Sequence, residues 1–209
     1  MEAKFQDLLK NIIPGFLILA GVLFISYISD IKFLLEIISK VISFPMELNL
    51  LFLPFILYIL GYTNDLISSQ LEFWLYEFIL PRPSYYILNG NTKRYRLAII
   101  TDIKNKLGID SCTTTFSKDE ANIHFQKANE IKRYSDNLNE FYLSYIFSRN
   151  ILNASFLVFI FSLLSLFSIN NLTTIWVILS LFLIVVAFGH RWRQRAFYYT
   201  RKVFQSVLF

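Results

Sequence analysis

The chain has 209 residues, of which 55% are hydrophobic, 18% aromatic and 17% charged. An average soluble domain is about 25% charged, and here the apolar residues gather in long uncharged runs. This composition excludes a disordered, collagen-like or disulfide-rich chain, and it disfavours an ordinary soluble enzyme. The net charge of +5 favours anionic partners or an anionic membrane surface.

The N-terminal region, residues 1–80, predicts two membrane spans, because each uncharged run is close to the roughly 20 residues that a spanning helix needs. We expect these spans at about 12–29 and 48–64. Between them, 33–44 has the period of an amphipathic helix and is interpreted as lying at the outer interface. The second span is expected to continue as a helix through 65–80, until the prolines that follow stop it.

Residues 81–149 are too charged to enter the bilayer and are expected to form a small helical cap. Asn91 or Thr92 can cap a helix whose apolar residues recur at helical spacing and which Gly108 ends; these residues are Leu97, Ile100, Ile103 and Leu107. Ser117 and Glu120 have the spacing of a capping box. From Ala121 an apolar stripe predicts one helix that runs through Arg149 into the third span. Residues 85–88 are interpreted as a loop.

The uncharged run 150–189 is long enough for two spans, and its polar centre is typical of a tight turn. It therefore predicts a transmembrane hairpin, with arms at 151–169 and 173–188. The segment 190–209 that follows predicts a basic amphipathic helix. Lysine and arginine concentrate in 81–149 and in this tail, so the positive-inside rule places both regions in the cytoplasm. The expected fold class is an all-α integral membrane protein with four spans, both termini being cytoplasmic.

A polar stripe follows one face of the second span and its extension at alternating steps of four and three residues. One interpretation is a water-exposed strip at the wall or mouth of a pore built from several subunits. The other is a polar seam within one subunit, in which Asp65 and Glu72 pair with Arg149 or with the basic tail. The stripe consists of Tyr58, Tyr62, Asp65, Ser69, Glu72 and Tyr76.

A basic face directly after the last span is the second polar feature. It consists of Arg191, Arg195, Tyr198 and Lys202 at helical spacing, beside an apolar face that contains Trp192. It is either an anchor on anionic headgroups or a site for a nucleotide or oligonucleotide, since arginine binds phosphate and aromatic rings stack on bases. Lys93, Arg94 and Arg96 form a second cluster of the same kind.

Arg149 and Asn150, at the mouth of the third span, are expected to act as a structural hub between the cap and the span. We find no catalytic constellation, because the nucleotide-binding, metalloprotease and hydrolase motifs are missing. Two histidines and one cysteine leave little for metal chemistry. The sequence therefore predicts no enzyme, no metal site and no cofactor.

This short all-α membrane protein, with Tyr58–Tyr76 on one helix and a basic aromatic end at His190–Lys202, resembles the channel effectors of bacterial anti-phage defence systems of the Hailong type. The resemblance implies a homo-oligomeric ion channel in the bacterial inner membrane, gated by an anionic nucleotide or DNA oligomer at the cytosolic basic region. The alternative function is a membrane scaffold without a channel, which recruits a cytosolic partner through 97–145. A proton-coupled transporter is disfavoured because every acidic residue lies at or beyond the end of a span.

Overall fold

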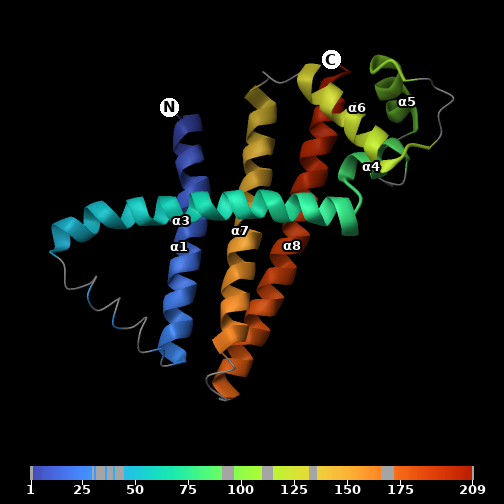
Figure 1. Ribbon diagram of the computed structural model, residues 1–209. Helices are drawn as coiled ribbons and strands as arrows, with labels where there is room; N and C mark the ends of the chain where they lie inside the picture. The colour runs from blue at the N-terminus through green and yellow to red at the C-terminus, as the bar shows by residue number, and fades with distance from the viewer. Residues whose placement is uncertain are drawn as a thin grey trace. The chain divides into compact units, whose positions relative to one another are not determined.

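The computed structural model describes residues 2–29, 31, 36, 40, 45–90, 97–109, 115–131, 136–165 and 172–208. Within these ranges all regular secondary structure is helical (Figure 1). The interfacial helix expected at 33–44 and the basic cluster of Lys93, Arg94 and Arg96 lie outside the described residues.

The described part of the chain contains seven α-helices and one π-helix. In chain order they are α1 (Glu2–Ile28), α3 (Met46–Trp74), the π-helix η1 (Leu75–Ile79), α4 (Pro83–Leu88), α5 (Leu97–Lys106), α6 (Lys118–Ile131), α7 (Asp136–Ser165) and α8 (Leu172–Ser206). These elements form two compact units. The membrane unit comprises Met1–Gln70 and Ile146–Trp192, and the cap unit comprises Leu71–Tyr145 and Arg193–Phe209.

Three helices are long and apolar enough to cross a membrane, which indicates a multi-pass membrane protein. Their candidate spans are Leu8–Ile28 in α1, Leu138–Ser165 in α7 and Thr173–Ser206 in α8. The span expected at 48–64 lies in α3 and is not among them, and the side chains of 46–51 are outside the described set. Tyr58, Asn64 and Asp65 lower the mean hydropathy of the described part of α3. The described residues thus give three candidate spans where four were expected.

Small residues let the helices of the membrane unit approach closely. Gly21 of α1 faces Val158 of α7, and a Cβ on Gly21 would lie 2.6 Å from both Val158 methyl carbons. Ser26 of α1 and Ala154 of α7 are fully buried. By contrast, hardly any of the apolar stretch of α8 is buried in a single copy of the chain, and its residues are exposed or half-buried.

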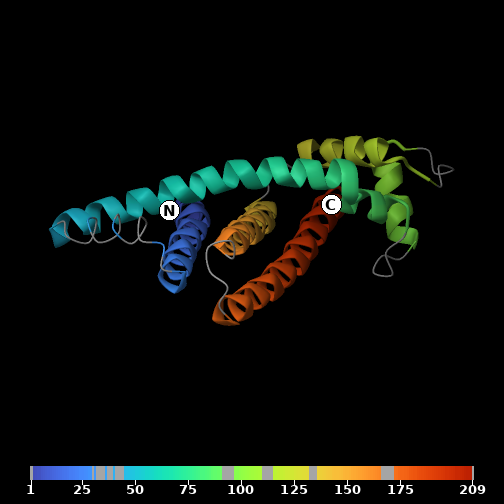
Figure 2. The same cartoon turned by 60° about the horizontal axis from the view of Figure 1, so that its bottom comes forward.

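α3 does not run alongside α1 and α7 but crosses them, as Figures 1 and 2 show. Its contact with α1 is a backbone-to-backbone approach at two glycines. A Cβ on Gly61 would lie 1.7 Å from the carbonyl oxygen of Asn11, and a Cβ on Gly15 would lie 1.9 Å from that of Leu57. Only glycine fits at either position, because the neighbouring atoms are main chain and cannot rotate away.

The cap unit has its own hydrophobic core, to which α4, α5, α6, α7 and α8 all contribute. Ile103, Ala121, Ala128, Val203 and Phe204 are all fully buried there. The capping box is present: the Ser117 amide donates to Glu120 Oε2 over 2.8 Å, and the Glu120 amide donates to Ser117 Oγ over 3.2 Å.

One prediction about the cap was wrong. Residues 85–88, which we expected to form a loop, belong to α4, because Ile87 and Leu88 are almost fully buried in the core of the cap unit. The helix expected from Ala121 through Arg149 is described in two parts, α6 and α7, and residues 132–135 lie outside the described residues. The continuity of that helix therefore stays a prediction.

Candidate functional site

A cluster of polar side chains joins α3 to α7 inside the membrane unit, and we call it the polar clasp. Asn64 Nδ2 donates to the Asn150 carbonyl oxygen over 2.9 Å, and Asn153 Nδ2 donates to Asn64 Oδ1 over 2.9 Å. Ser68 Oγ donates to Asn150 Oδ1 over 2.8 Å. Asn64 and Asn150 are almost completely buried, so these bonds pair groups that would be costly to leave without partners, although Asn150 Nδ2 has no partner among the described residues. The clasp consists of Asn64, Asp65, Ser68, Arg149, Asn150 and Asn153.

The ion pair at the edge of the clasp joins Arg149 to Asp65 at 2.5 Å. This is one of the pairings that the sequence allowed, and it uses both the polar stripe and the proposed hub. Both side chains are partly exposed, so the pair contributes less than a fully buried one would. The geometry favours the interpretation of a seam for Asp65, whose carboxylate is held by its own subunit.

The next turn beyond α3 is a π-helix, η1, closed by a hydrogen bond from the Leu80 amide to the Leu75 carbonyl. Single π-turns occur frequently at functional sites, because the extra residue re-aims the side chains. Tyr76 on η1 is only 5% exposed, and the Arg82 guanidinium lies 5.5 Å from the centroid of its ring. Burial raises the pKa of Tyr76 above its ordinary value, and the nearby Glu72 raises it further.

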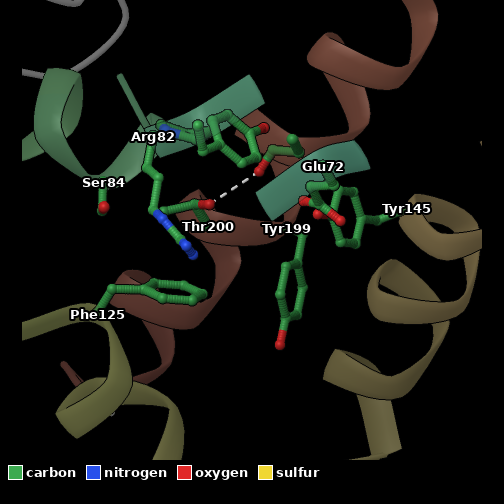
Figure 3. A pocket seen from close by; sticks show the side chains of 10 residues that line it. Glu72, Arg82, Ser84, Phe125, Tyr145, Tyr199 and Thr200 are labelled. Carbon is green, nitrogen blue, oxygen red and sulfur yellow. Dashed lines mark hydrogen bonds between the residues drawn. The ribbon is translucent and has the colours of Figure 1, made fainter. Parts of the chain in front are cut away.

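A cavity of about 100 Å³ lies beside Tyr76 within the cap unit. Figure 3 shows Arg82 and Phe125 on one side of it, Glu72 and Tyr145 on the other, and Thr200 between them. Its size suits one phosphate group or a small ring, since a dry cavity of roughly 150 Å³ accepts benzene. The lining residues are Glu72, Tyr76, Arg82, Pro83, Ser84, Phe125, Tyr145, Ala196, Tyr199 and Thr200.

Two polar groups of this cavity are available to a ligand. Ser84 is 2% exposed, and its Oγ has no hydrogen-bond partner among the described residues. Arg82 is half-buried, so its guanidinium, which lies against the Tyr76 ring, remains open to water or to an anion. Buried polar atoms are nearly always hydrogen-bonded in folded proteins, so the Ser84 hydroxyl calls for a partner such as water or a ligand.

The basic face predicted on α8 is exposed along the described helix. Arg191, Tyr198 and Lys202 are exposed and Arg195 is half-buried, whereas Trp192, on the apolar side, is 4% exposed. In the cap unit the apolar side packs into the protein core, since Val203 and Phe204 are fully buried. That packing disfavours the interpretation of a lipid anchor, because the face that would enter the bilayer is already covered by protein.

The six residues of the predicted polar stripe do not share one environment. Tyr58 and Tyr62 are exposed and their rings stack, with centroids 6.4 Å apart. Ser69 bonds to the carbonyl of Leu66 on its own helix. Glu72 and Tyr76 line the cavity of the cap unit, while Asp65 belongs to the clasp.

Sequence reasoning missed Arg82, Ser84 and Thr200 as members of a site. They come from the segment after η1 and from the far end of α8, and no local spacing links these positions. The one available signal was Pro81-Arg82-Pro83, where an arginine is held between two prolines of fixed backbone geometry.

Comparison of the chain with models of protein families, with curated proteins and with solved structures finds no match.

Proposed function

We propose that this chain is the subunit of a homo-oligomeric channel in the bacterial inner membrane, whose cytosolic cap binds an anionic nucleotide or oligonucleotide. The observation that carries the proposal is the origin of the residues that line the cavity. Glu72 belongs to α3, Tyr145 to α7 and Thr200 to α8, and each of these helices also supplies residues to the membrane unit. A ligand in the cavity therefore contacts helices that are continuous with the membrane-embedded part.

The ligand chemistry follows from the charges of the cap. Arg82 offers a planar fork that matches phosphate geometry, and the rings of Phe125, Tyr145 and Tyr199 offer faces on which a base can stack. The carboxylate of Glu72 also lines the cavity, so a ligand there would place its phosphate beside Arg82 rather than beside Glu72. The basic face of α8, on which Arg191 and Lys202 are exposed, supplies further positive charge on another side of the helix that provides Thr200. Nothing in this arrangement requires a metal, a cofactor or a catalytic step.

An oligomer is part of the proposal because three or four helices in one copy enclose no pore of their own. Hardly any of the apolar stretch of α8 is buried within a single copy, which leaves room for contacts with further copies. The alternative function, a scaffold without a channel, draws on the apolar residues Ile123 and Ile131, which are exposed on α6.

Ion flux tests the channel. The purified chain, reconstituted into potassium-loaded liposomes, should release potassium, and the rate should change about ten-fold when a short single-stranded DNA oligomer is added on the cap side. Arg82→Gln should keep the flux and lose the response to DNA. Liposomes that retain their potassium both with and without DNA would contradict the channel and favour the scaffold function of 97–145.

Direct binding tests the ligand site separately. The fluorescence anisotropy of a labelled DNA oligomer should show binding to the wild-type protein in detergent, weakening as salt rises. The double variant Arg195→Glu/Lys202→Glu should weaken binding at least about ten-fold, because phosphate contacts supply most of such affinity. Lys118→Glu, an exposed charge reversal on α6, is the matched control and should bind as the wild type does. Equal losses in both variants would show only a general charge effect and reject the site.

A further inference from the structure

The circumference of α3 is divided into three sectors, one buried, one polar and one apolar. One helical residue turns the chain by about 100°, so residues three and four apart share a face. The buried sector contains Leu57, Gly61, Asn64 and Ser68, and it contacts α1 and α7. The polar sector beside it contains Tyr58, Tyr62, Asp65 and Ser69.

The remaining sector of α3 is apolar and open. Its members have 39 to 60% of their surface exposed, far more than core residues have. Thr63, at its centre, is polar. No described residue of the same copy covers it. It consists of Phe55, Ile56, Ile59, Leu66 and Ile67.

The level at which α3 crosses its neighbours coincides with the start of their uncharged runs. The contact on α1 extends from Asn11, directly after Lys10, to Gly15, and the contact on α7 extends from Asn150, directly after Arg149, to Asn153, so both lie in the first turn of the runs. Charged side chains mark where a membrane helix leaves the hydrocarbon. If α1 and α7 span the bilayer, α3 crosses both at the boundary between hydrocarbon and water.

The ion pair fixes which sector faces which way. Asp65, from the polar sector, reaches Arg149, which precedes the uncharged run of α7 and lies on its charged side. Asn64, from the buried sector, accepts a hydrogen bond from Asn153, one turn into that run. The polar sector therefore points toward water. At about 100° per residue, the middle of the apolar sector lies roughly 100° from that of the polar sector and on the far side of α3 from the buried sector, so it faces away from α1 and α7 and is turned from water.

We propose that α3 lies in the plane of the membrane interface on the cap side, with its apolar sector buried among the acyl chains of that leaflet and its polar sector in water. This replaces a fourth span at 48–64 by a helix that lies on the membrane and is fastened to two spans by the glycine contact and the polar clasp. The stacked Tyr58 and Tyr62 then sit at headgroup level, where amphipathic rings are favoured. The inference stands whether or not the protein is a channel.

Single cysteines on the exposed sectors test this orientation, in a Cys112→Ser background. Ile59→Cys and Leu66→Cys probe the apolar sector, and Tyr62→Cys and Ser69→Cys the polar sector. A bimane label at 59 or 66 should be quenched by acyl-chain spin labels attached near the headgroup, and equally at both positions. The two residues are roughly 10 Å apart along the helix, so a spanning helix would place them at clearly different depths.

The polar-sector cysteines should react with a water-soluble maleimide about ten times faster than the apolar-sector pair, and only from the cap side. Phe24→Cys, exposed more than two turns beyond the α3 contact in the span of α1, is the control for deep quenching, and Tyr198→Cys on the cap is the control for none. Unequal depths at 59 and 66 would overturn the proposal. It would also fail if neither label were quenched by lipid while the Ile59→Cys copies formed disulfides with one another, because a second copy would then cover the sector.

Discussion

Replacing Gly61 with alanine should destabilise the membrane unit by about 1–3 kcal/mol, the usual range for overpacking a tightly packed site. The added Cβ would lie 1.7 Å from the Asn11 carbonyl oxygen, so α3 and α1 must move apart. Their separation would also strain the neighbouring polar clasp, since Asn64 is less than one turn away. The thermal midpoint in detergent, followed by tryptophan fluorescence, should fall by several degrees.

Gly189 provides the matched control, because it is a second helical glycine of the same unit. A Cβ there would have Leu152 Cδ1 as its neighbour at 3.8 Å, which is an ordinary contact. Alanine is favoured over glycine in a helix by roughly 0.8–1 kcal/mol, so Gly189→Ala should leave the midpoint unchanged or raise it. If the two variants unfolded at the same temperature, the close crossing of α1 and α3 would be wrong.

The features that sequence predicted well are those set by neighbouring residues. The capping box of Ser117 and Glu120 needs only a spacing of three, and the end of α5 near Gly108 needs only a residue that tolerates a positive φ, here +70°. The spans in α1, α7 and α8 depend on length and hydropathy, which are also local properties. In each case the deciding interaction lies within about one turn or one run of the chain.

The features that sequence failed to predict depend on partners far along the chain. Residues 85–88 are helical because Ile87 and Leu88 pack in the core of the cap unit. No local sequence pattern predicts that packing. The period of α3 identified a polar stripe and allowed Asp65 to pair with Arg149, but it left open whether that pair would form, and it did not show that Tyr76 would be buried. The cavity unites Arg82 with Thr200, and only the folded cap brings those two positions together.

The separation into two units has a consequence for mutations in the cap. Phe204 on α8 is fully buried in the core of the cap unit, with 0% of its surface exposed. Its ring meets that of Phe125 edge to face, with centroids 5.9 Å apart. Truncating a buried phenylalanine to alanine typically costs 3–5 kcal/mol, because apolar burial is lost and a cavity is left. For a cap of this size, that is a large fraction of a typical total stability of about 5–15 kcal/mol.

Phe204→Ala should therefore open the cap while the membrane unit stays folded. Amide hydrogen exchange in detergent should become faster in α5 and α6 and remain slow in the buried turns of α1, since local stability need not be uniform across a protein. Tyr198→Ala, on the same helix but 41% exposed, is the matched control and should leave both patterns unchanged. Equal acceleration in α1 and α6 would show that the two units unfold as one. In that case a ligand on the cap could act on the membrane helices only through global stability, whereas independent opening leaves α3, α7 and α8 as the connections through which it acts.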